Sequence, residues 1–159
     1  MGLRWTCARL QDLSPLALYQ ALALRSQVFV LEQACVYLDP DGIDLQAWHL
    51  LGHDEASGEL YANARLLPPL AKGPTHLLPE IGRVVSAPVA RGTGAGRALM
   101  QQAIAQCERL WPGQAIAINA QAYLLDFYAS QGFVQISPPY DEDGILHIDM
   151  QRPSDASMT

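Results

Sequence analysis

The stretch that decides the fold is Arg83-Val84-Val85-Ser86-Ala87-Pro88-Val89-Ala90-Arg91-Gly92-Thr93-Gly94-Ala95-Gly96. Its first residues, together with Ile81 and Gly82, are rich in β-branched side chains and stop before Pro88, so a strand is predicted over 81–86. The glycine-rich segment is a turn, and the apolar residues of 95–110 recur at helical spacing. A strand, a glycine-rich turn and a helix in this order point free backbone N–H groups at an anion.

Spacing excludes two familiar phosphate-binding loops. A P-loop needs a lysine followed by Ser or Thr, whereas an arginine and an alanine follow Gly96. A dinucleotide fingerprint needs a third glycine at its sixth position, which is absent whether the count starts at Gly92 or at Gly94. What remains is Arg-x-x-Gly-x-Gly, from Arg91 through Gly94 to Gly96, with Arg97 adding positive charge. Taken alone, this pattern also fits a plain tight turn between a strand and a helix.

On the N-terminal side of this stretch the pattern predicts a helix between strands. Residues 4–10 alternate loosely, as a first strand does, and Ser14-Pro15 is typical of a helix start. That helix is expected to end near Glu32. The runs 47–53 and 60–67 are then predicted to form a half-buried antiparallel hairpin.

On the C-terminal side the pattern predicts a strand, a helix and a closing hairpin. The fully apolar run 115–118 is typical of a central strand buried on both faces. A helix over 122–131 is expected to stop at Gly132. The alternation over 146–150 indicates the last hairpin. Residues 68–80, between the earlier strands, hold four prolines and one glycine and are expected to form a loop.

The resulting order, β-α-β-β-β-α-β-α-β-β, predicts an α/β protein (an α+β mixed sheet) with helices on the faces of the sheet. The chain has 159 residues, of which 50% are apolar and 16% are charged, which fits one domain with a continuous core. We assign this single domain to 1–152. The polar tail 153–159 is expected to be frayed.

Composition and spacing argue against several classes of function. The net charge of −6 disfavours nucleic acid as the main partner. No segment approaches the roughly 18 apolar residues of a membrane span, and no leader pattern precedes the first strand, so a cytoplasmic protein is expected. The cysteines Cys7, Cys35 and Cys107 lack CxxC spacing and are interpreted as small buried side chains in a reducing compartment. No His or Cys cluster has metal-ligand spacing, and residues 39–44 lack the remainder of an EF-hand, so no metal is predicted.

The glycine-rich stretch also resembles the acetyl-CoA-binding motif of the GNAT acetyltransferases. The segment 126–133, Asp-Phe-Tyr-Ala-Ser-Gln-Gly-Phe, is similar to their second motif, a helix ending in FY…GF. The segments 24–33, 120–122 and 140–148 further resemble the ElaA-type branch of that family. Together these matches cover nearly the whole chain. The resemblance implies the GNAT fold, with splayed middle strands, and transfer of an acetyl group from acetyl-CoA to a primary amine of a small molecule or a peptide.

The resemblance implies a place for the cosubstrate. The pyrophosphate is expected on the backbone amides of the glycine loop, and the pantetheine arm beside the preceding strand, whose N–H groups would polarise the thioester. The cofactor-binding residues expected are Val84, Val85, Ser86, Arg91, Gly92, Thr93, Gly94, Ala95, Gly96, Arg97, Gln121 and Tyr128. Core packing is the alternative for the two valines, and it is compatible with a role of their backbone. Capping of the following helix is the alternative for Gln121.

Tyr128 matches the family's general acid. A tyrosine with its ordinary pKa of about 10 is protonated at neutral pH and can donate a proton to the leaving thiolate. Without the resemblance, a core aromatic residue on an amphipathic helix is the competing interpretation.

Four residues are candidates for the general base, and the pattern does not choose among them. Glu32 shares a helical face with Arg25 and Phe29, so these three form either a substrate pocket or a structural polar network. His49 and His147 lie on predicted strands, where a histidine is either a base or a satisfied structural group. Glu80, just before the central strand, could act through a water molecule.

Two other functions compete with the acetyltransferase. One is a non-catalytic sensor that binds acyl-CoA on the same fold. The other is a synthase-like relative that makes an acylated signal molecule, against which the short chain and the complete FY…GF motif argue. The residues around the expected acceptor pocket are acidic, which suggests a cationic acceptor or simply a solvated acidic surface. These are Phe29, Glu32, Asp39, Asp41, Asp44, Tyr140, Asp141, Glu142 and Asp143. A homodimer is common among relatives, but no pattern here specifies one.

Overall fold

A computed structural model describes residues 2–154 and contains one eight-stranded sheet. The strands follow the order β1-β2-β3-β4-β5-β8-β6, and β7 pairs with β8. Only β4 and β5 are parallel neighbours, and every other pair is antiparallel. This mixed sheet confirms the predicted fold class. The strands are β1 Leu3–Arg9, β2 Trp48–Asp54, β3 Leu60–Leu67, β4 Glu80–Ser86, β5 Ile116–Gln121, β6 Val134–Gln135, β7 Tyr140–Glu142 and β8 Ile145–Arg152.

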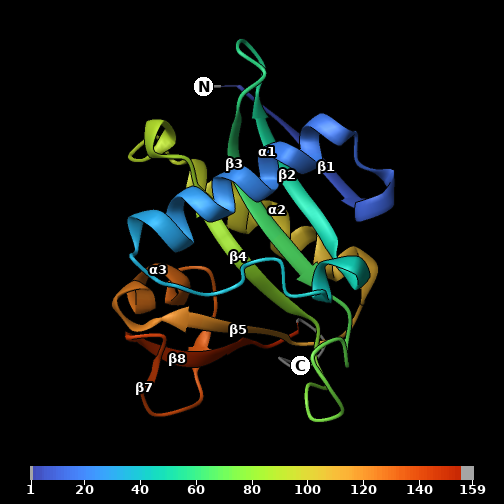
Figure 1. Cartoon of the computed structure of the whole chain (residues 1–159). Helices are drawn as coiled ribbons and strands as arrows, with labels where there is room; N and C mark the ends of the chain where they lie inside the picture. The colour runs from blue at the N-terminus through green and yellow to red at the C-terminus, as the bar shows by residue number, and fades with distance from the viewer. Residues whose placement is uncertain (1, 155–159) are drawn as a thin grey trace.

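Two long helices cover opposite faces of the sheet, with α1 in front and α2 behind in the view of Figure 1. Helix α1 (Pro15–Arg25) begins as predicted, because Ser14 Oγ accepts a hydrogen bond from the Ala17 N–H at 3.1 Å. Helix α2 spans Ala95–Leu110. The short helical segments are η1 Leu10–Asp12, η2 Ser26–Glu32, η3 Ile43–Gln46, η4 Pro88–Ala90, η5 Ala122–Leu124 and α3 Leu125–Ala129.

Each face of the sheet has its own apolar core. Leu24 of α1 packs in a cluster with Leu51 and Val85. Leu99 and neighbouring apolar residues of α2 pack on the other face in a cluster with Leu50. Because successive residues of a strand point to opposite faces, Leu50 and Leu51 of β2 serve the two cores in turn. The sheet is thereby held between the two helices.

The two middle strands separate soon after they meet. The parallel pair β4 and β5 is joined only at Glu80↔Ala117 and Ile81↔Ile118. Beyond these pairs the ribbons of β4 and β5 diverge (Figure 1). The splayed middle strands expected from the family resemblance are therefore present.

A β-bulge accompanies this separation. Asn63 pairs with Val85 and Arg65 with Gly82, so two residues of β4 lie opposite one residue of β3. Arg83 is in the bulge with a φ of 50°, and Asn63 Nδ2 donates a hydrogen bond to its carbonyl oxygen at 2.9 Å. Because a bulge bends its strand, it contributes to turning β4 away from β5.

Several local predictions need correction. The 60–67 strand is not half-buried, since Asn63 and Arg65 on its second face are only 1% and 2% exposed beneath α1 and the following loop. The central strand β5 is not buried on both faces. Its alternate residues Ile116, Ile118 and Ala120 are buried and the residues between them are partly exposed, because that side borders the cavity described below.

The first and the last predicted helices also differ in detail from their predictions. The first helix does extend to Glu32, but its last seven residues form the π-helix η2, in which the Gln33 N–H bonds to Val28 O at 3.0 Å. The predicted helix over 122–131 is divided into η5 and α3. It stops before Gly132, as predicted, and this glycine has a φ of 93°.

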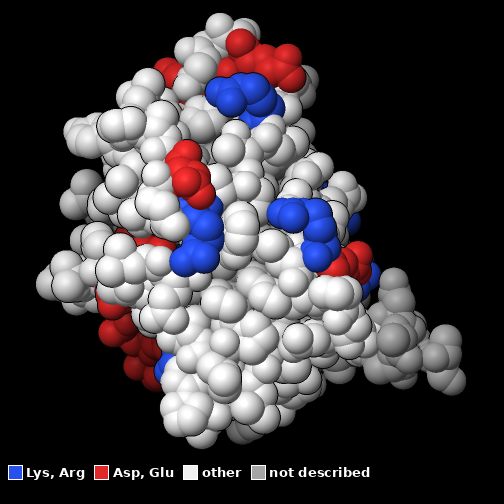
Figure 2. Space-filling view, turned by 90° about the vertical axis from the view of Figure 1, so that its right-hand side faces the viewer, with Lys and Arg blue, Asp and Glu red and all other residues white. Residues whose placement is uncertain are grey.

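The surface carries few charges. Figure 2 shows a face on which basic side chains form isolated groups beside acidic ones, without a continuous basic area. Within residues 2–154, no helix is both long and apolar enough to cross a membrane. Positions 155–159 of the predicted frayed tail lie outside the described residues.

Candidate active site

A cavity of about 560 Å³ opens where β4 and β5 diverge. The glycine loop lies at one end of it, through Arg91 and Gly96, and Tyr128 lines it from α3. Most of the predicted site residues are among its lining, namely Phe29, Glu32, Glu80, Val84, Val85, Ser86, Arg91, Gly96, Gln121, Tyr128 and His147. The fold therefore brings together residues from positions 29 to 147 of the chain.

The glycine loop has the backbone geometry of an open turn. Gly92 and Gly94 have φ values of 77° and 88°, in the left-handed region that favours glycine. The first helical bond of α2 runs from the Ala98 N–H to Gly94 O at 3.0 Å. The amides of the first turn before Ala98 have no helical acceptor, so they are available to an anion. A Cβ on Gly94 would meet no atom within 4 Å, which leaves open space beside the turn.

An ion pair joins this loop to the end of the first helix. Arg91 Nη1 lies 2.7 Å from Glu32 Oε1, and the two side chains are 46% and 42% exposed. The sequence left open whether Glu32 and Arg25 share a substrate pocket or a polar network, and in the structure the charge partner of Glu32 is Arg91.

Tyr128 is held by aromatic neighbours. Its ring contacts Phe127 and Phe133 edge to face, with centroid distances of 5.1 and 6.1 Å. The residue is 6% exposed, and burial raises its pKa to about 12. Within residues 2–154 its hydroxyl has no hydrogen-bond partner. The phenol is therefore protonated, lines the cavity and is free to donate a hydrogen bond.

His147 presents one ring nitrogen to the cavity. Its Nδ1 lies 2.8 Å from the carbonyl oxygen of Ile145, so Nδ1 carries the proton that is donated there. Its Nε2 lies 3.5 Å from Glu142 Oε2, and Glu142 also accepts a hydrogen bond from Asn119 Nδ2 at 3.0 Å. In the neutral ring, Nε2 is then the basic nitrogen.

Next to this group, Tyr140 is firmly anchored. Its hydroxyl lies 2.6 Å from Asp149 Oδ1 and 2.8 Å from Asn119 Oδ1. Burial, followed by the hydrogen bond to Asp149, raises the pKa of Tyr140. The phenol is thus fixed beside the Asn119–Glu142–His147 group rather than free to move.

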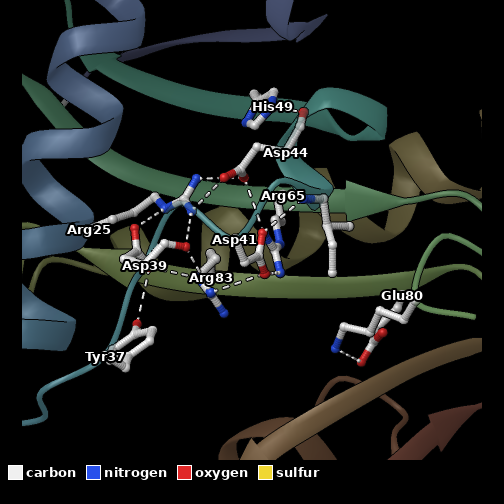
Figure 3. A network of polar contacts seen from close by, with 11 residues as sticks. Arg25, Tyr37, Asp39, Asp41, Asp44, His49, Arg65, Glu80 and Arg83 are labelled. Atoms are coloured by element: carbon white, nitrogen blue, oxygen red, sulfur yellow. Dashed lines mark hydrogen bonds and ion pairs between the residues drawn. The ribbon is translucent and has the colours of Figure 1, made fainter.

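The remaining carboxylate candidate, Glu80, is at the closed end of the strand gap. Lys72 Nζ lies 3.0 Å from Glu80 Oε1, and both residues line the cavity. The Glu80 side chain is 11% exposed and that of Lys72 is 28% exposed. Figure 3 shows Glu80 apart from the larger group of charges around Arg25.

That larger group is a network of three arginines and three aspartates, which we call the arginine–aspartate network (Figure 3). It consists of Arg25, Arg65 and Arg83 with Asp39, Asp41 and Asp44. Arg25 bonds to Asp39 Oδ2 and Asp44 Oδ1, each at 2.8 Å. Because the aspartates belong to the segment after η2, the network fastens this segment, which forms one wall of the cavity, to β3 and β4.

The network explains why Arg25 and His49 lie outside the cavity lining. The other predicted residues outside it belong to the glycine loop and the start of α2, namely Gly92, Thr93, Gly94, Ala95 and Arg97. The Arg25 side chain is 1% exposed and is enclosed by its two aspartates. His49 is 2% exposed, and its Nε2 lies 3.1 Å from the Asp44 carbonyl oxygen. Burial lowers the pKa of His49, so the ring stays neutral. Of the candidate bases, the structure places Glu32, Glu80 and His147 at the cavity and leaves His49 in the sheet.

The arginines of the network also balance the negative charge of three aspartates that were expected at the acceptor pocket. Burial alone would raise the pKa of Asp41, but hydrogen bonds and charge from Arg65 lower it to about 2. The pKa of Asp44 is lowered in the same way, against its burial, by Arg25. Asp39 lies between Arg25 and Arg83. The acidic side chains left to face the cavity are Glu32, Glu80, Glu142 and Asp143.

Asn119 and Lys72 are among the cavity residues that the sequence did not indicate as site candidates. Asn119 lies two residues before Gln121 and therefore shares a face of β5 with it. This spacing could have indicated that Asn119 also lines the cavity. Lys72 comes from the proline-rich loop. The feature of the sequence that could have drawn attention to it is that the chain has no other lysine. Gln121 does not cap the following helix, because its Nε2 donates to Gln33 Oε1 at 3.2 Å.

No metal site accompanies these groups among residues 2–154, where no three His, Cys, Asp or Glu side chains are arranged to hold an ion.

Known proteins are similar to this chain in sequence and in fold. Residues 75–153 match the family model described as an acetyltransferase (GNAT) domain. A UPF0039 protein of Synechocystis sp. is 43% identical over 150 residues, which cover 94% of this chain and 95% of that protein. Protein ElaA of Escherichia coli is 40% identical over 153 residues, which cover 94% and 96%. The chain belongs to the GNAT acetyltransferase family, in its ElaA-type branch.

A solved structure supports the assignment of this GNAT chain. A crystal structure described as an acyl-CoA N-acyltransferase from Pseudomonas aeruginosa superposes with a TM-score of 0.87 at 42% identity. The match covers 95% of this chain and 99% of that one. These findings indicate an acyltransferase.

Proposed function

We propose that this GNAT protein transfers an acetyl group from acetyl-CoA directly to a primary amine. The observation that carries the proposal is the cavity between the diverging strands, which joins an anion-binding glycine loop to a protonated tyrosine. Acyl transfer to an amine needs an anchored acyl donor, a polarised carbonyl, a base for the amine and an acid for the thiolate. Each requirement has a candidate group in this cavity.

The loop residues fit a diphosphate. The amides that precede Ala98 are free of helical bonds, and the left-handed glycines leave open space where side chains would otherwise stand. Arg91 adds a positive charge at the cavity. Arg97, exposed on the first turn of α2, adds a second. A diphosphate at this place would be bound by backbone amides and the helix dipole.

The separated strand β4 fits the pantetheine arm. Beyond Ile81, the edge of β4 at Val84 and Val85 has no partner in β5, so the backbone groups on this edge can pair with an extended amide chain. The same groups would stabilise negative charge on the thioester oxygen. The valine side chains meanwhile pack against the two cores.

Tyr128 is proposed to protonate the leaving thiolate. Its raised pKa keeps it protonated across the physiological range, and its hydroxyl is not engaged elsewhere among residues 2–154. A neutral phenol is a suitable donor because it still carries its proton at neutral pH, whereas an ordinary carboxylate is ionised and has no proton to give.

His147 is proposed to accept the proton of the attacking amine. Its Nδ1 is fixed by the Ile145 carbonyl, which leaves the basic Nε2 beside Glu142. Glu142 would hold the incoming ammonium group and then stabilise the imidazolium. Glu32 is the charge partner of Arg91, and Glu80 is already engaged by Lys72. The acceptor is therefore expected to be a primary amine whose ammonium form pairs with one carboxylate, that of Glu142.

The test is release of free CoA thiol with a panel of mono- and polyamines and peptide amines. Wild-type protein is expected to release many equivalents of thiol per protein molecule only when an amine is present, and His147→Gln is expected to lower this rate about 10²-fold. Asn119→Asp is expected to lower the rate as well, because it replaces the hydrogen-bond donor to Glu142 by a second carboxylate. Binding of acetyl-CoA without thiol release for any amine would favour the acyl-CoA sensor instead.

A further inference from the structure

The chain has a single lysine, and it is in the cavity. Lys72 is the only lysine among ten Lys and Arg residues, so every other side-chain cation is an arginine. A guanidinium stays protonated in proteins and is a poor nucleophile, whereas an alkylamine that loses its proton attacks a thioester. Lys72 thus supplies the only nucleophilic side-chain amine of the molecule.

Its surroundings are those of an amine acceptor. Lys72 Nζ donates to Glu80 Oε1 at 3.0 Å, and Glu80 as a residue is 8% exposed. The Glu80 pair with Ala117 is the first of the two β4–β5 pairs, so this contact lies at the closed end of the strand gap. Tyr128 lines the same cavity. The amine therefore shares one enclosed space with a carboxylate that can take its proton and a phenol that can protonate a thiolate.

The segment carrying Lys72 is suited to small movements. It lies outside strands and helices, between β3 and β4, and four prolines interrupt it. A few turn bonds hold it, such as that from the Leu70 N–H to His76 O at 2.7 Å. The lysine side chain adds four rotatable methylene groups to this loop. Its Nζ can consequently be displaced along the cavity without breaking a sheet bond.

We propose that Lys72 is an internal acetyl acceptor, so that the protein acetylates itself at this position. The inference rests on the proposed acetyl-CoA-dependent function. The Lys72 ammonium gives one proton to Glu80, and the freed amine forms a C–N bond to the acetyl carbonyl carbon. The C–S bond of acetyl-CoA breaks, and Tyr128 protonates the thiolate. The amine nitrogen releases its second proton in the same step, and this proton restores the Tyr128 phenol. The products are acetyl-Lys72, free CoA thiol and one proton that returns through Glu80 to solvent.

Acetylation would change the cavity itself. The amide has no positive charge, so the ion pair with Glu80 is lost. Glu80 would then present an unpaired carboxylate at the closed end of the strand gap, and the cavity would gain one net negative charge. Self-acetylation is thus expected to alter which acceptor amines the cavity accepts.

The test is to incubate the whole protein with acetyl-CoA and no added amine, and to follow its intact mass. One added acetyl group is expected, and peptide mapping should place it on Lys72 and not on the N-terminal amine. Lys72→Arg keeps the charge and should stay unmodified. Tyr128→Phe should slow the modification about 10²-fold. The rate per molecule should not change on dilution, as an intramolecular reaction requires.

Calorimetry on the same samples separates the two claims. If acetyl-CoA binds and Lys72 stays unmodified, the self-acetylation is wrong while the proposed function stands. Modification at equal rates in Tyr128→Phe, or a rate that falls with dilution, also contradicts it, because ordinary chemical acetylation would explain both. If acetyl-CoA does not bind, the proposed function is wrong, and the self-acetylation that rests on it is wrong as well.

Discussion

Arg91 Nη1 lies 2.7 Å from Glu32 Oε1, so the end of the first helix is paired with the first residue of the glycine loop. Both side chains are nearly half exposed, and surface pairs of this kind contribute at most about 1 kcal/mol to stability. We therefore expect Glu32 to affect how strongly the charge of Arg91 attracts a ligand, and to affect the stability of the fold very little. In the absence of a diphosphate, Glu32 offsets the charge of Arg91.

The first prediction concerns this pair. Glu32→Gln is expected to tighten acetyl-CoA binding about 2- to 5-fold, because removing the competing carboxylate leaves Arg91 to the diphosphate. Calorimetry at low and moderate salt is the measurement, and the gain should shrink as salt increases. Glu108→Gln is a matched control, because Glu108 is 48% exposed and pairs with Arg152 at 3.2 Å. Weaker binding in Glu32→Gln would show that Glu32 positions Arg91 instead.

The second prediction concerns the acid. Tyr128→Phe is expected to lower kcat about 10²- to 10³-fold while acetyl-CoA affinity changes little, because the hydroxyl acts on the leaving group. Burial raises the pKa of Tyr128 to about 12, which also predicts how kcat depends on pH. The rate should show no fall from tyrosine ionisation below about pH 11. An unchanged kcat in Tyr128→Phe would return this residue to its alternative role, packing against Phe127 and Phe133.

The third prediction concerns the arginine–aspartate network. Arg25→Ala is expected to reduce the free energy of unfolding by about 3–5 kcal/mol, because it leaves buried carboxylates of Asp39 and Asp44 without their partner. Arg83→Ala should cost less, since the Arg83 side chain is 22% exposed and water can replace it. Urea denaturation of both variants measures the difference. If both variants lose the same small amount of unfolding free energy, Arg25 and its aspartates are not buried from solvent as described.

The fourth prediction is the loss of stability in acid. The folded-state pKa of Asp41 is about 2 and that of Asp44 is also lowered, against 3.8 for an unperturbed aspartate. A lowered folded pKa stabilises the protein above the unfolded pKa, and that stability is lost as pH falls through the folded pKa. The Asp41 contribution is about 1–2 kcal/mol, reduced by solvent because its side chain is 26% exposed.

Thermal unfolding between pH 5 and pH 2 measures this effect. The wild-type midpoint should fall steeply below about pH 4. In Asp41→Asn the midpoint should be lower at neutral pH and should fall less on acidification. Parallel curves for the two proteins would contradict the pKa assignment.

Local signals predicted much of this fold. Ser14-Pro15 marks the helix start, and Gly132 the end of the second helix, because both act through the backbone of their own turn. The glycine loop was likewise predicted from residues adjacent in sequence. The pattern of 60–67 predicts a half-buried strand, because Asn63 and Arg65 are polar and polar side chains usually face water.

What could not be predicted depends on residues distant in sequence. Arg65 is buried because Asp41, 24 positions away, pairs with it. The bulge at Arg83 depends on pairing with β3, and it has a positive φ that no arginine would suggest. The same limit applies to the candidate site. Glu32 and Arg25 share a helical face, but their partners come from other segments.

The most direct test of the central claim is calorimetry with acetyl-CoA on wild-type protein, Gly94→Glu and Gly113→Glu. Both glycines have a left-handed φ, 88° and 78°, and open space around a Cβ, so both substitutions strain the backbone alike. Only Gly94→Glu places a carboxylate at the glycine loop. Micromolar binding by wild-type and Gly113→Glu, abolished in Gly94→Glu with an unchanged circular dichroism spectrum, is the result predicted. Equal binding by all three folded proteins, or none by wild-type, would contradict the claim that this loop holds the diphosphate of acetyl-CoA.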